Sequence, residues 1–335
     1  MSNTIRLVQI RNTEGRRLAL VQEPSLVLLH TFNSVYELAL AAIDTETKLV
    51  DLIQQSLSAG KLDYDAIYKG QSDWSLLPAF DCPDSPFACL VAGTGLTHKN
   101  SALNRQMMHQ NADDKPTDSM QMYQWGVNGG SPAPGTIGVQ PEWFYKGNGA
   151  VLRAHNQTLE VPAYANDGGE EPEVAGIYVV DNHGNPFRIG FATGNEFSDH
   201  VMEKKNYLYL APSKLRQCAI GPELVIDGDF SSVSGSVSVV RDGEILWASA
   251  IKTGEENMAH TLSNLEYHHF KYANHRIPKQ CHVHFFGADA FSFGNKIQLQ
   301  NNDEMVVEWL GFGRALKNKV LVRQEAETLI PIRSL

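Results

Sequence analysis

The segment Gly168–Asn182, GGEEPEVAGIYVVDN, constrains the fold more than any other part of the chain. The run from Val174 to Val180 is rich in Val, Ile and Tyr, which predicts a buried strand. In an extended chain, residues two apart lie on one face, so Glu171 and Glu173 point to the same side as the apolar residues that follow. Two like charges at the entry to a core are costly unless a partner neutralises them. The segment therefore predicts a buried strand whose start carries a cation site.

A hard cation suits this carboxylate pair, because Mg²⁺, and also Mn²⁺ and Ca²⁺, prefer oxygen ligands. Glu196 in GFATGNEFSDHV supplies a third carboxylate where a predicted strand runs into a polar turn, and Asp199 is the competing choice. Glu170 is out of phase and is expected to be solvated. His282 and His284 share one strand face and are a weaker metal candidate, because no third ligand follows at a fixed spacing. Solvated acidic residues at strand ends are the alternative interpretation of the carboxylates.

Composition limits the class of protein. The chain has 335 residues, 42% of them hydrophobic, which is enough for a main domain and a smaller one. A net charge of -10 argues against a nucleic-acid partner but not against a small anionic substrate. The N-terminus lacks the apolar core of a signal peptide, and no apolar run approaches the roughly 20 residues that span a membrane. We therefore expect a cytoplasmic protein with no membrane partner, whose four cysteines are reduced.

The order of the predicted elements favours an α+β fold that is mostly β. A hairpin, IRLVQI and LALVQ, precedes a helix that starts at the capping box of Ser34 and Glu37 and can end at Gly60. Prolines then mark a boundary, so residues 1–86 are expected to form a small N-terminal α+β region and residues 87–335 the main domain. Helices are predicted at 100–110 and 255–273. Many strands with few crossover helices predict a mixed β-roll or barrel with flanking helices. The predicted strands are ACLVAG, GIYVVD, FRIGFATG, GSVSVVRDGEILWAS, CHVHFFG, KIQLQ and MVVEWLG.

Five motifs, in the same order, resemble those of the fumarylacetoacetate hydrolase superfamily over residues 88–321. They are PEWFYK at 141–146, EPEVA at 171–175, GFATGNEFSD at 190–199, Lys214 followed by Gly221-Pro222, and NDEMVVEWLGFGRALKNKV near the C-terminus. Within the superfamily, LVAGTGLTHKNSALNRQMM is similar to the GguC-like branch, whose relatives include dehydratases of 2-keto-3-deoxy sugar acids.

The resemblance implies a fumarylacetoacetate hydrolase-like fold and a homodimer or higher homo-oligomer. It also implies a divalent metal, usually Mg²⁺ with Mn²⁺ or Ca²⁺ as alternatives, held by Glu171, Glu173 and Glu196. The candidate catalytic residues are Glu142, Lys214 and His98. The candidate substrate contacts are Lys146, Thr97, Ser198 and Asp289.

The function that the resemblance implies is a Mg²⁺-dependent dehydratase. Its substrate would be a 2-keto-3-deoxypentonate, such as the D-arabinonate or D-xylonate derivative, converted to 2-oxoglutarate semialdehyde through a metal-stabilised enolate. Glu142 and Lys214 are the expected base and acid, in an order that the sequence leaves open.

Two other functions stay open. One is an acylpyruvate or 2,4-diketo acid hydrolase, which needs a water-activating pair; the only candidate is His98 with an acidic neighbour. The loop FGADAFSFG lacks the Thr of the hydrolases, and LTHKNSA replaces their early NYxxH element, so hydrolysis is disfavoured. Glu196 stands where Asp is the usual third ligand, and its longer side chain can still reach a metal. The other is a non-catalytic sugar-acid binding or regulatory protein.

Overall fold

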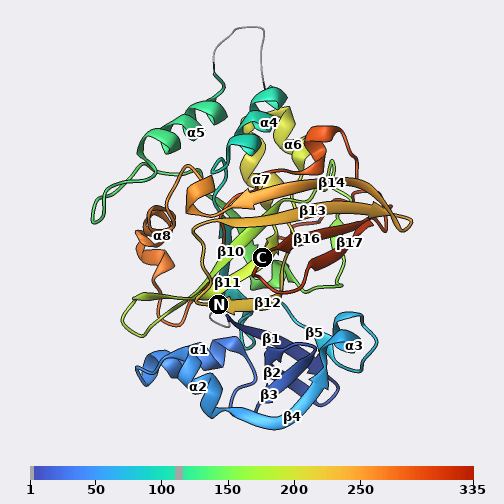
Figure 1. Ribbon diagram of the computed structural model, residues 1–335. Helices are drawn as coiled ribbons and strands as arrows, with labels where there is room; N and C mark the ends of the chain where they lie inside the picture. Colours follow the sequence, from blue (N-terminus) through green and yellow to red (C-terminus); the bar gives the residue numbers. More distant parts are fainter. Residues whose placement is uncertain (1–3, 110–115) are drawn as a thin grey trace.

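Most of the regular structure lies in two β-sheets. The computed structural model describes residues 4–109 and 116–335 (Figure 1). The large sheet has twelve strands in the order β4-β3-β2-β1-β12-β11-β10-β15-β6-β7, with β5 paired to β1 and β8 paired to β12. Its strands are β1 (Ile5–Asn12), β2 (Gly15–Gln22), β3 (Ser25–Leu29), β4 (Leu57–Asp63), β5 (Ser75–Leu76), β6 (Cys89–Gly93), β7 (Phe144–Asn148), β8 (Leu152–Arg153), β10 (Pro172–Val180), β11 (Pro186–Asn195), β12 (Cys218–Ile226) and β15 (Cys281–Phe285).

The smaller sheet has five strands in the order β14-β13-β16-β17-β9 and crosses the upper front of the molecule (Figure 1). Its strands are β9 (Leu159–Val161), β13 (Val233–Arg241), β14 (Glu244–Thr253), β16 (Glu304–Trp309) and β17 (Leu316–Val322). The described residues also form eight α-helices, none long and apolar enough to cross a bilayer. They are α1 (Val35–Asp44), α2 (Leu49–Gln55), α3 (Tyr64–Tyr68), α4 (Lys99–His109), α5 (Asp118–Gly129), α6 (His200–Lys205), α7 (Leu210–Lys214) and α8 (Leu262–Phe270).

The central strand is β10, as the Val/Ile/Tyr run predicts. Every residue of β10 is buried, because β11 pairs with one edge and β15 with the other. Its side chains alternate between two cores: Ala175 and Ile177 join the larger core, whereas Val174 and Tyr178 join the core below the five-stranded sheet. A strand covered on both faces needs apolar residues at nearly every position, which explains why this segment shows no polar alternation.

The α+β, mostly β class is confirmed, but closure into a barrel is wrong for the described residues. The large sheet is open, with β4 at one end and β7 at the other. The predicted strand KIQLQ is also wrong, since residues 297–300 have no regular structure. The helix predicted at 255–273 is shorter, Leu262–Phe270. The helix predicted at 100–110 is α4, and residue 110 lies outside the described residues.

The long helix predicted to end at Gly60 is two helices followed by a strand. Ser34 caps α1 by accepting a hydrogen bond from the Glu37 backbone N–H at 3.1 Å, as its capping-box spacing predicts. The helix ends at Thr45, whose Oγ1 bonds back to the Ala41 carbonyl, and the next residue, Glu46, has a φ of 51°. A non-glycine residue in this left-handed region cannot continue an α-helix. Gly60 lies in β4.

The first strands, which lie at the bottom of Figure 1, join the rest of the large sheet where β1 pairs with β12. One buried carboxylate reinforces this junction. Glu223 on β12 accepts hydrogen bonds from Arg6 Nη1 (2.8 Å), the Tyr64 hydroxyl (2.9 Å) and the Arg314 backbone N–H (3.1 Å). The boundary at residue 86 stays a prediction.

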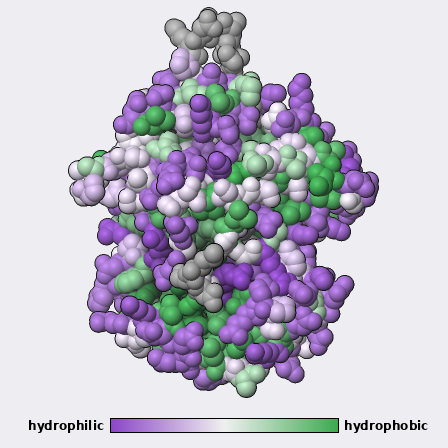
Figure 2. Space-filling model, viewed as in Figure 1, coloured by the Kyte–Doolittle hydropathy of each residue, from purple (hydrophilic) through white to green (hydrophobic). Residues whose placement is uncertain are grey.

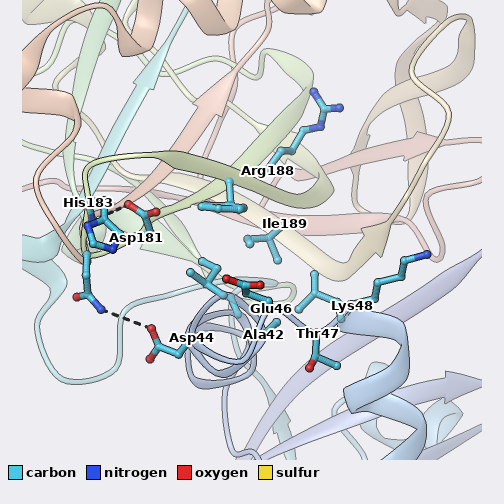
Figure 3. Close-up of a pocket in the computed structure, with 14 residues that line it drawn as sticks. Ala42, Asp44, Glu46, Thr47, Lys48, Asp181, His183, Arg188 and Ile189 are labelled. Carbon is cyan, nitrogen blue, oxygen red and sulfur yellow. Dashed lines mark hydrogen bonds between the residues drawn. The ribbon is translucent and has the colours of Figure 1, made fainter.

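A pocket of about 560 Å³ opens between the turn that follows α1 and the turn that joins β10 to β11 (Figure 3). Ala42 and Ile189 contribute apolar surface, and the Asn182 amide reaches Asp44 at 3.4 Å across it. In the space-filling view, the surface is hollowed between the upper and lower parts of the molecule, with hydrophobic residues gathered in the lower part (Figure 2). The pocket of Figure 3 lies at the opposite end of β10 from Glu173 and contains none of the predicted site residues.

Replacing Glu223 tests the junction. Glu223→Ala should lower the free energy of unfolding by about 3 kcal/mol, because it leaves the Arg6 guanidinium and the Tyr64 hydroxyl without their acceptor. Chemical denaturation measures the change. Arg323→Ala removes an exposed ion pair with Glu160 and should leave the unfolding midpoint unchanged. Equal effects of the two substitutions would show that the junction does not depend on Glu223.

Candidate metal centre

Glu171, Glu173 and Glu196 come together in the structure. One carboxylate oxygen from each lies within 4.8 Å of the others, and all three residues are buried. The antiparallel register of β10 and β11 causes this meeting: Pro172 pairs with Asn195, so Glu171 and Glu196 flank the last pair, and the Glu196 N–H donates to the Glu171 carbonyl at 2.9 Å. Asp199, the competing third ligand, is not in this cluster. It caps α6 and pairs with Arg216 at 2.6 Å.

Two buried lysines face the cluster from other elements. Lys214, the last residue of α7, donates to Glu171 Oε1 (2.6 Å), Glu196 Oε2 (2.7 Å) and the Ser198 hydroxyl (3.0 Å). Lys146 on β7 lies 2.5 Å from Glu196 Oε1 and donates to the Phe197 carbonyl. Of the predicted substrate contacts, Lys146 and Ser198 therefore lie directly beside the carboxylates.

The charges in this cluster are only partly balanced. Burial would raise the pKa of Glu171, but Lys214 and His200 lower it well below its usual value. Burial raises the pKa of Glu173 well above its usual value, and the charges of Glu196 and Glu171 add to this effect. Burial also raises the pKa of Glu196, to about 7, although Lys146 and Lys214 oppose it. Of the three carboxylates, Glu173 is thus the one whose negative charge is least stabilised by neighbouring positive charges.

A divalent cation fits this donor set. All three donors are carboxylates, as a hard cation requires. Three carboxylates outnumber the two ammonium groups, so the buried set keeps a net negative charge when all are ionised. A buried excess charge is costly without a further positive partner. The residues that would hold the metal are Glu171, Glu173 and Glu196.

A narrow pocket lies over Glu171 and Glu173. Its volume is about 20 Å³, which is room for about one water molecule. Its lining includes three ionisable residues that are not among the predicted site residues: Arg105, His200 and Glu203. Two of them lie beside sequence features already noted, because Arg105 ends the GTGLTHKNSALNR segment and His200 follows Asp199 directly.

Glu142 borders this pocket through Arg105. Both Glu142 oxygens lie 2.8 Å from Arg105 Nη1, and the Tyr207 hydroxyl donates to Glu142 Oε2 at 3.1 Å. Arg105 Nε also lies 2.6 Å from Glu203. A Cβ on Gly95, which lines the pocket, would overlap the Glu142 carboxylate, so this glycine is needed for the close approach.

His98 has no carboxylate partner among the described residues. Its Nδ1 lies 2.9 Å from the Thr97 hydroxyl and its Nε2 lies 3.1 Å from the Thr253 hydroxyl. Burial lowers the pKa of His98 to about 3, so the ring is neutral. Thr97 is held in turn by the Phe286 carbonyl, and the half-buried Asp289 bonds the Asn100 side chain and the Lys252 N–H. The structure therefore does not bring His98, Thr97 or Asp289 into the pocket lining.

Glu170 corrects one expectation. It is fully buried rather than solvated, and its carboxylate accepts hydrogen bonds from the Ser292 N–H (2.6 Å) and the Ser292 hydroxyl (2.9 Å). Alternation holds in direction, because Glu170 turns away from the metal cluster toward a loop 122 residues later. The expected solvation is wrong because this loop covers the side to which Glu170 points.

His282 and His284 join a buried histidine cluster instead of the carboxylate site. His269 Nε2 lies 2.9 Å from His282 Nδ1, and the His269 and His284 rings are 4.3 Å apart. Trp143 can only donate, and it donates to His269 Nδ1, so His269 in turn donates to His282. Within the described residues, the only group with metal-ligand spacing is the carboxylate cluster.

Comparisons with known proteins support the fold. No protein-family profile matches the chain. A crystal form of 2-keto-3-deoxyarabinonate dehydratase has a TM-score of 0.71 and 16% identity, covering 96% of this chain and 100% of that one. A 2-keto-3-deoxy-D-arabinonate dehydratase complexed with magnesium and 2,5-dioxopentanoate has a TM-score of 0.70 and 17% identity at the same coverage.

One curated relative, a probable 2-keto-3-deoxyxylonate dehydratase from Haloferax volcanii, is 29% identical over 121 residues. These residues are 35% of this chain and 40% of the relative, so the match spans less than half of each protein. A 5-carboxymethyl-2-hydroxymuconate delta-isomerase from Mycobacterium smegmatis is also among the similar structures, with a TM-score of 0.58 and 15% identity, covering 95% of this chain and 100% of that one. The chain has the fold of these dehydratases and this isomerase. The predicted resemblance to the fumarylacetoacetate hydrolase superfamily is confirmed at the level of the fold.

Removing single carboxylates tests the metal centre. Glu171→Ala, Glu173→Ala and Glu196→Gln should each weaken Mg²⁺ binding by more than roughly 10–100-fold, which is the usual cost of losing a residue that only hydrogen-bonds to a metal ligand. Titration calorimetry measures the affinity. Asp199→Asn is the matched control, because it changes a buried carboxylate only three residues from Glu196 and should keep the wild-type affinity. Loss of binding in the control alone would make Asp199 the third ligand.

The histidine cluster predicts an acid-sensitive fold. Burial, with the charge of His275, lowers the pKa of His282 and His284 to about 3, far below the value of an unfolded histidine. As the pH falls below about 6.5, these histidines bind protons in the unfolded chain but stay neutral in the folded chain. Their contribution to the free energy of unfolding is therefore fully present above this pH and is lost as the pH falls toward 3. The free energy of unfolding of His284→Leu should therefore fall less steeply than that of the wild type between about pH 7 and about pH 5. Urea unfolding measures this slope, and the exposed-site control His183→Gln should keep the wild-type slope.

Proposed function

We propose that this protein is a Mg²⁺-dependent dehydratase of a 2-keto-3-deoxy sugar acid, most simply a 2-keto-3-deoxypentonate. The observation that carries the proposal is the buried cluster of Glu171, Glu173 and Glu196 with Lys146 and Lys214, in a chain with the fold of known 2-keto-3-deoxy sugar acid dehydratases. The product is 2-oxoglutarate semialdehyde, which is 2,5-dioxopentanoate, the compound bound in one of the similar structures.

The charges of the site suit a monoanionic 2-oxo acid. With a divalent cation bound, the three carboxylates, the two lysines and the cation leave one positive charge, which the carboxylate of the substrate balances. When bound, the cation supplies Lewis-acid stabilisation of charge that develops on the 2-oxo group. Lys214 and Lys146 add fixed positive charge in a water-excluded site, where electrostatic stabilisation is large.

The proton transfers are assigned to Glu142 and Lys214. Dehydration removes a proton from C3 and expels the C4 hydroxyl, which leaves as water after it receives a proton. The C3–C4 unsaturated 2-oxo acid that results is an isomer of the product. A proton moves from C5 to C3, and the C4–C5 enol then tautomerises to the aldehyde of 2-oxoglutarate semialdehyde. Glu142 is paired with Arg105 at 2.8 Å, and we assign it as the base. Lys214 is held as an ammonium by Glu171 and Glu196, so it is the acid. Tyr207 fixes the orientation of Glu142 through its hydroxyl.

The hydrolase alternative is less well supported. Its water-activating pair needed a carboxylate beside His98, and His98 lies between two threonine hydroxyls. His200 does contact a carboxylate, at 3.0 Å, but that carboxylate is Glu171, one of the proposed metal ligands. A residue that holds a cation is poorly available to orient a general base.

Product analysis tests the function. A panel of 2-keto-3-deoxy sugar acids incubated with the protein and Mg²⁺ should yield 2-oxoglutarate semialdehyde from a pentonate, detected by mass spectrometry. Chelation of Mg²⁺ should abolish turnover and readdition should restore it. Release of pyruvate would indicate carbon–carbon bond cleavage instead. Recovery of all substrates unchanged, with sugar acid still bound, would indicate a binding protein.

Replacing Glu142 tests the assigned base. Glu142→Gln should lower kcat by about 10²–10⁴-fold, the usual contribution of a general base, while Mg²⁺ affinity stays at the wild-type level. Glu203→Gln is the matched control, because Glu203 is the other carboxylate paired with Arg105, and it should slow turnover far less. Similar losses in both variants would assign the effect to Arg105 rather than to a base at Glu142.

A further inference from the structure

The carboxyl group of Glu170 is a buried polar group that the proposed chemistry does not use. It is fully buried, and Ser292 occupies both of its oxygens, through the backbone N–H at 2.6 Å and the hydroxyl at 2.9 Å. A buried polar group without hydrogen-bond partners is costly. This contact therefore fixes Ser292 firmly to the residue that precedes the first metal ligand.

Ser292 lies in a loop between β15 and β16 that covers the narrow pocket. Two residues of this loop, Ala288 and Phe291, line the pocket. The loop is attached at its start by the Gly287 N–H, which donates to Glu173 Oε2 at 2.6 Å, and at its middle by Ser292. The same short segment, Glu170–Glu173, thus supplies two of the three predicted metal ligands and two of the attachment points of the covering loop.

A chain of contacts leads from this loop back to the metal cluster. The Phe291 ring stacks on the His200 ring at 4.8 Å between centroids, with an interplanar angle of 8°. His200 Nε2 lies 3.0 Å from Glu171 Oε1. A Cβ on Gly169 would overlap the His200 ring, so the ring is confined between Gly169 and Phe291. Displacing Ser292 would release Phe291 and, through it, the ring that contacts Glu171.

We propose that Glu170 is a positioning residue: through Ser292 it holds residues 287–293 over the reaction site and sets Phe291 against His200. The role of the loop in enclosing a sugar acid rests on the proposed function. The attachment of the loop to Glu170 does not depend on that function. The pocket has room for about one water molecule, so a sugar acid enters only when the loop at residues 287–293 moves away from it. The contact of Glu170 with Ser292 then sets how readily the loop returns to its closed position.

Hydrogen exchange measures the loop without substrate. Glu170→Leu removes both acceptors at similar size, and Ser292→Ala removes the hydroxyl donor alone. Both should speed exchange of the amides at residues 287–295, Glu170→Leu by about tenfold or more, since both hydrogen bonds from Ser292 lose their acceptor. Glu170→Gln, which keeps one carbonyl acceptor, and Ser292→Thr, which keeps the hydroxyl, should fall closer to the wild type. Exchange in this loop equal to the wild type in Ser292→Ala and Glu170→Leu would overturn the proposal.

Measurements of turnover and of Mg²⁺ affinity distinguish a positioning role of Glu170 from a general effect on folding. In Glu170→Leu, kcat/KM for the sugar acid should fall about tenfold, while Mg²⁺ affinity stays within the wild-type range. Asp303→Asn is the control: Asp303 is a buried carboxylate paired with Arg241 away from the pocket, so it should lower the melting temperature without changing the loop exchange or kcat/KM. Loss of Mg²⁺ binding in Glu170→Leu would overturn the proposal, because Glu170 would then act on the metal directly. Faster loop exchange in a protein whose wild type turns over no sugar acid would support the loop attachment and reject the proposed function.

Discussion

The burial of three carboxylates at one end of β10 is the constraint on which the rest of the structure depends. Charges in this position are stable only with partners, and the partners come from distant parts of the chain: Lys146 from β7 and Lys214 from the end of α7. The strands must pair in one register to bring Glu196 beside Glu171. The fold around β10 can therefore be understood as the arrangement that gathers these five buried side chains at one place.

The sequence could predict the parts of this arrangement that follow from local geometry. Alternation along an extended chain places Glu171 and Glu173 on one side, and this required no knowledge of the fold. The same rule places Glu170 on the other side, but it does not show that this side is also covered, so the expected solvation of Glu170 was wrong. The burial of Glu170 depends on Ser292, and nothing in a linear sequence shows that these two residues meet.

Other features of the structure also depend on tertiary contacts that the sequence does not show. The capping box at Ser34 correctly placed the start of α1, but the apolar spacing continued through the turn at Glu46 and hid the end of the helix. KIQLQ alternates like a strand, yet it finds no partner strand in the sheet. Arg105 and His200 were missed because a lone Arg on a helix and a His after a strand are common, and only the folded chain brings both to the pocket lining.

The position of Lys214 explains why the cluster can exist before a cation arrives. Its ammonium bridges Glu171 and Glu196, the pair that the β10–β11 register brings together, and leaves Glu173 with the Gly287 N–H as its partner. Glu173 is consequently the carboxylate whose charge is least compensated, and the one with most to gain from a divalent cation. The same side chain holds the start of the covering loop. A single carboxylate, Glu173, thus both faces the predicted cation site and accepts the hydrogen bond that fixes the start of the loop.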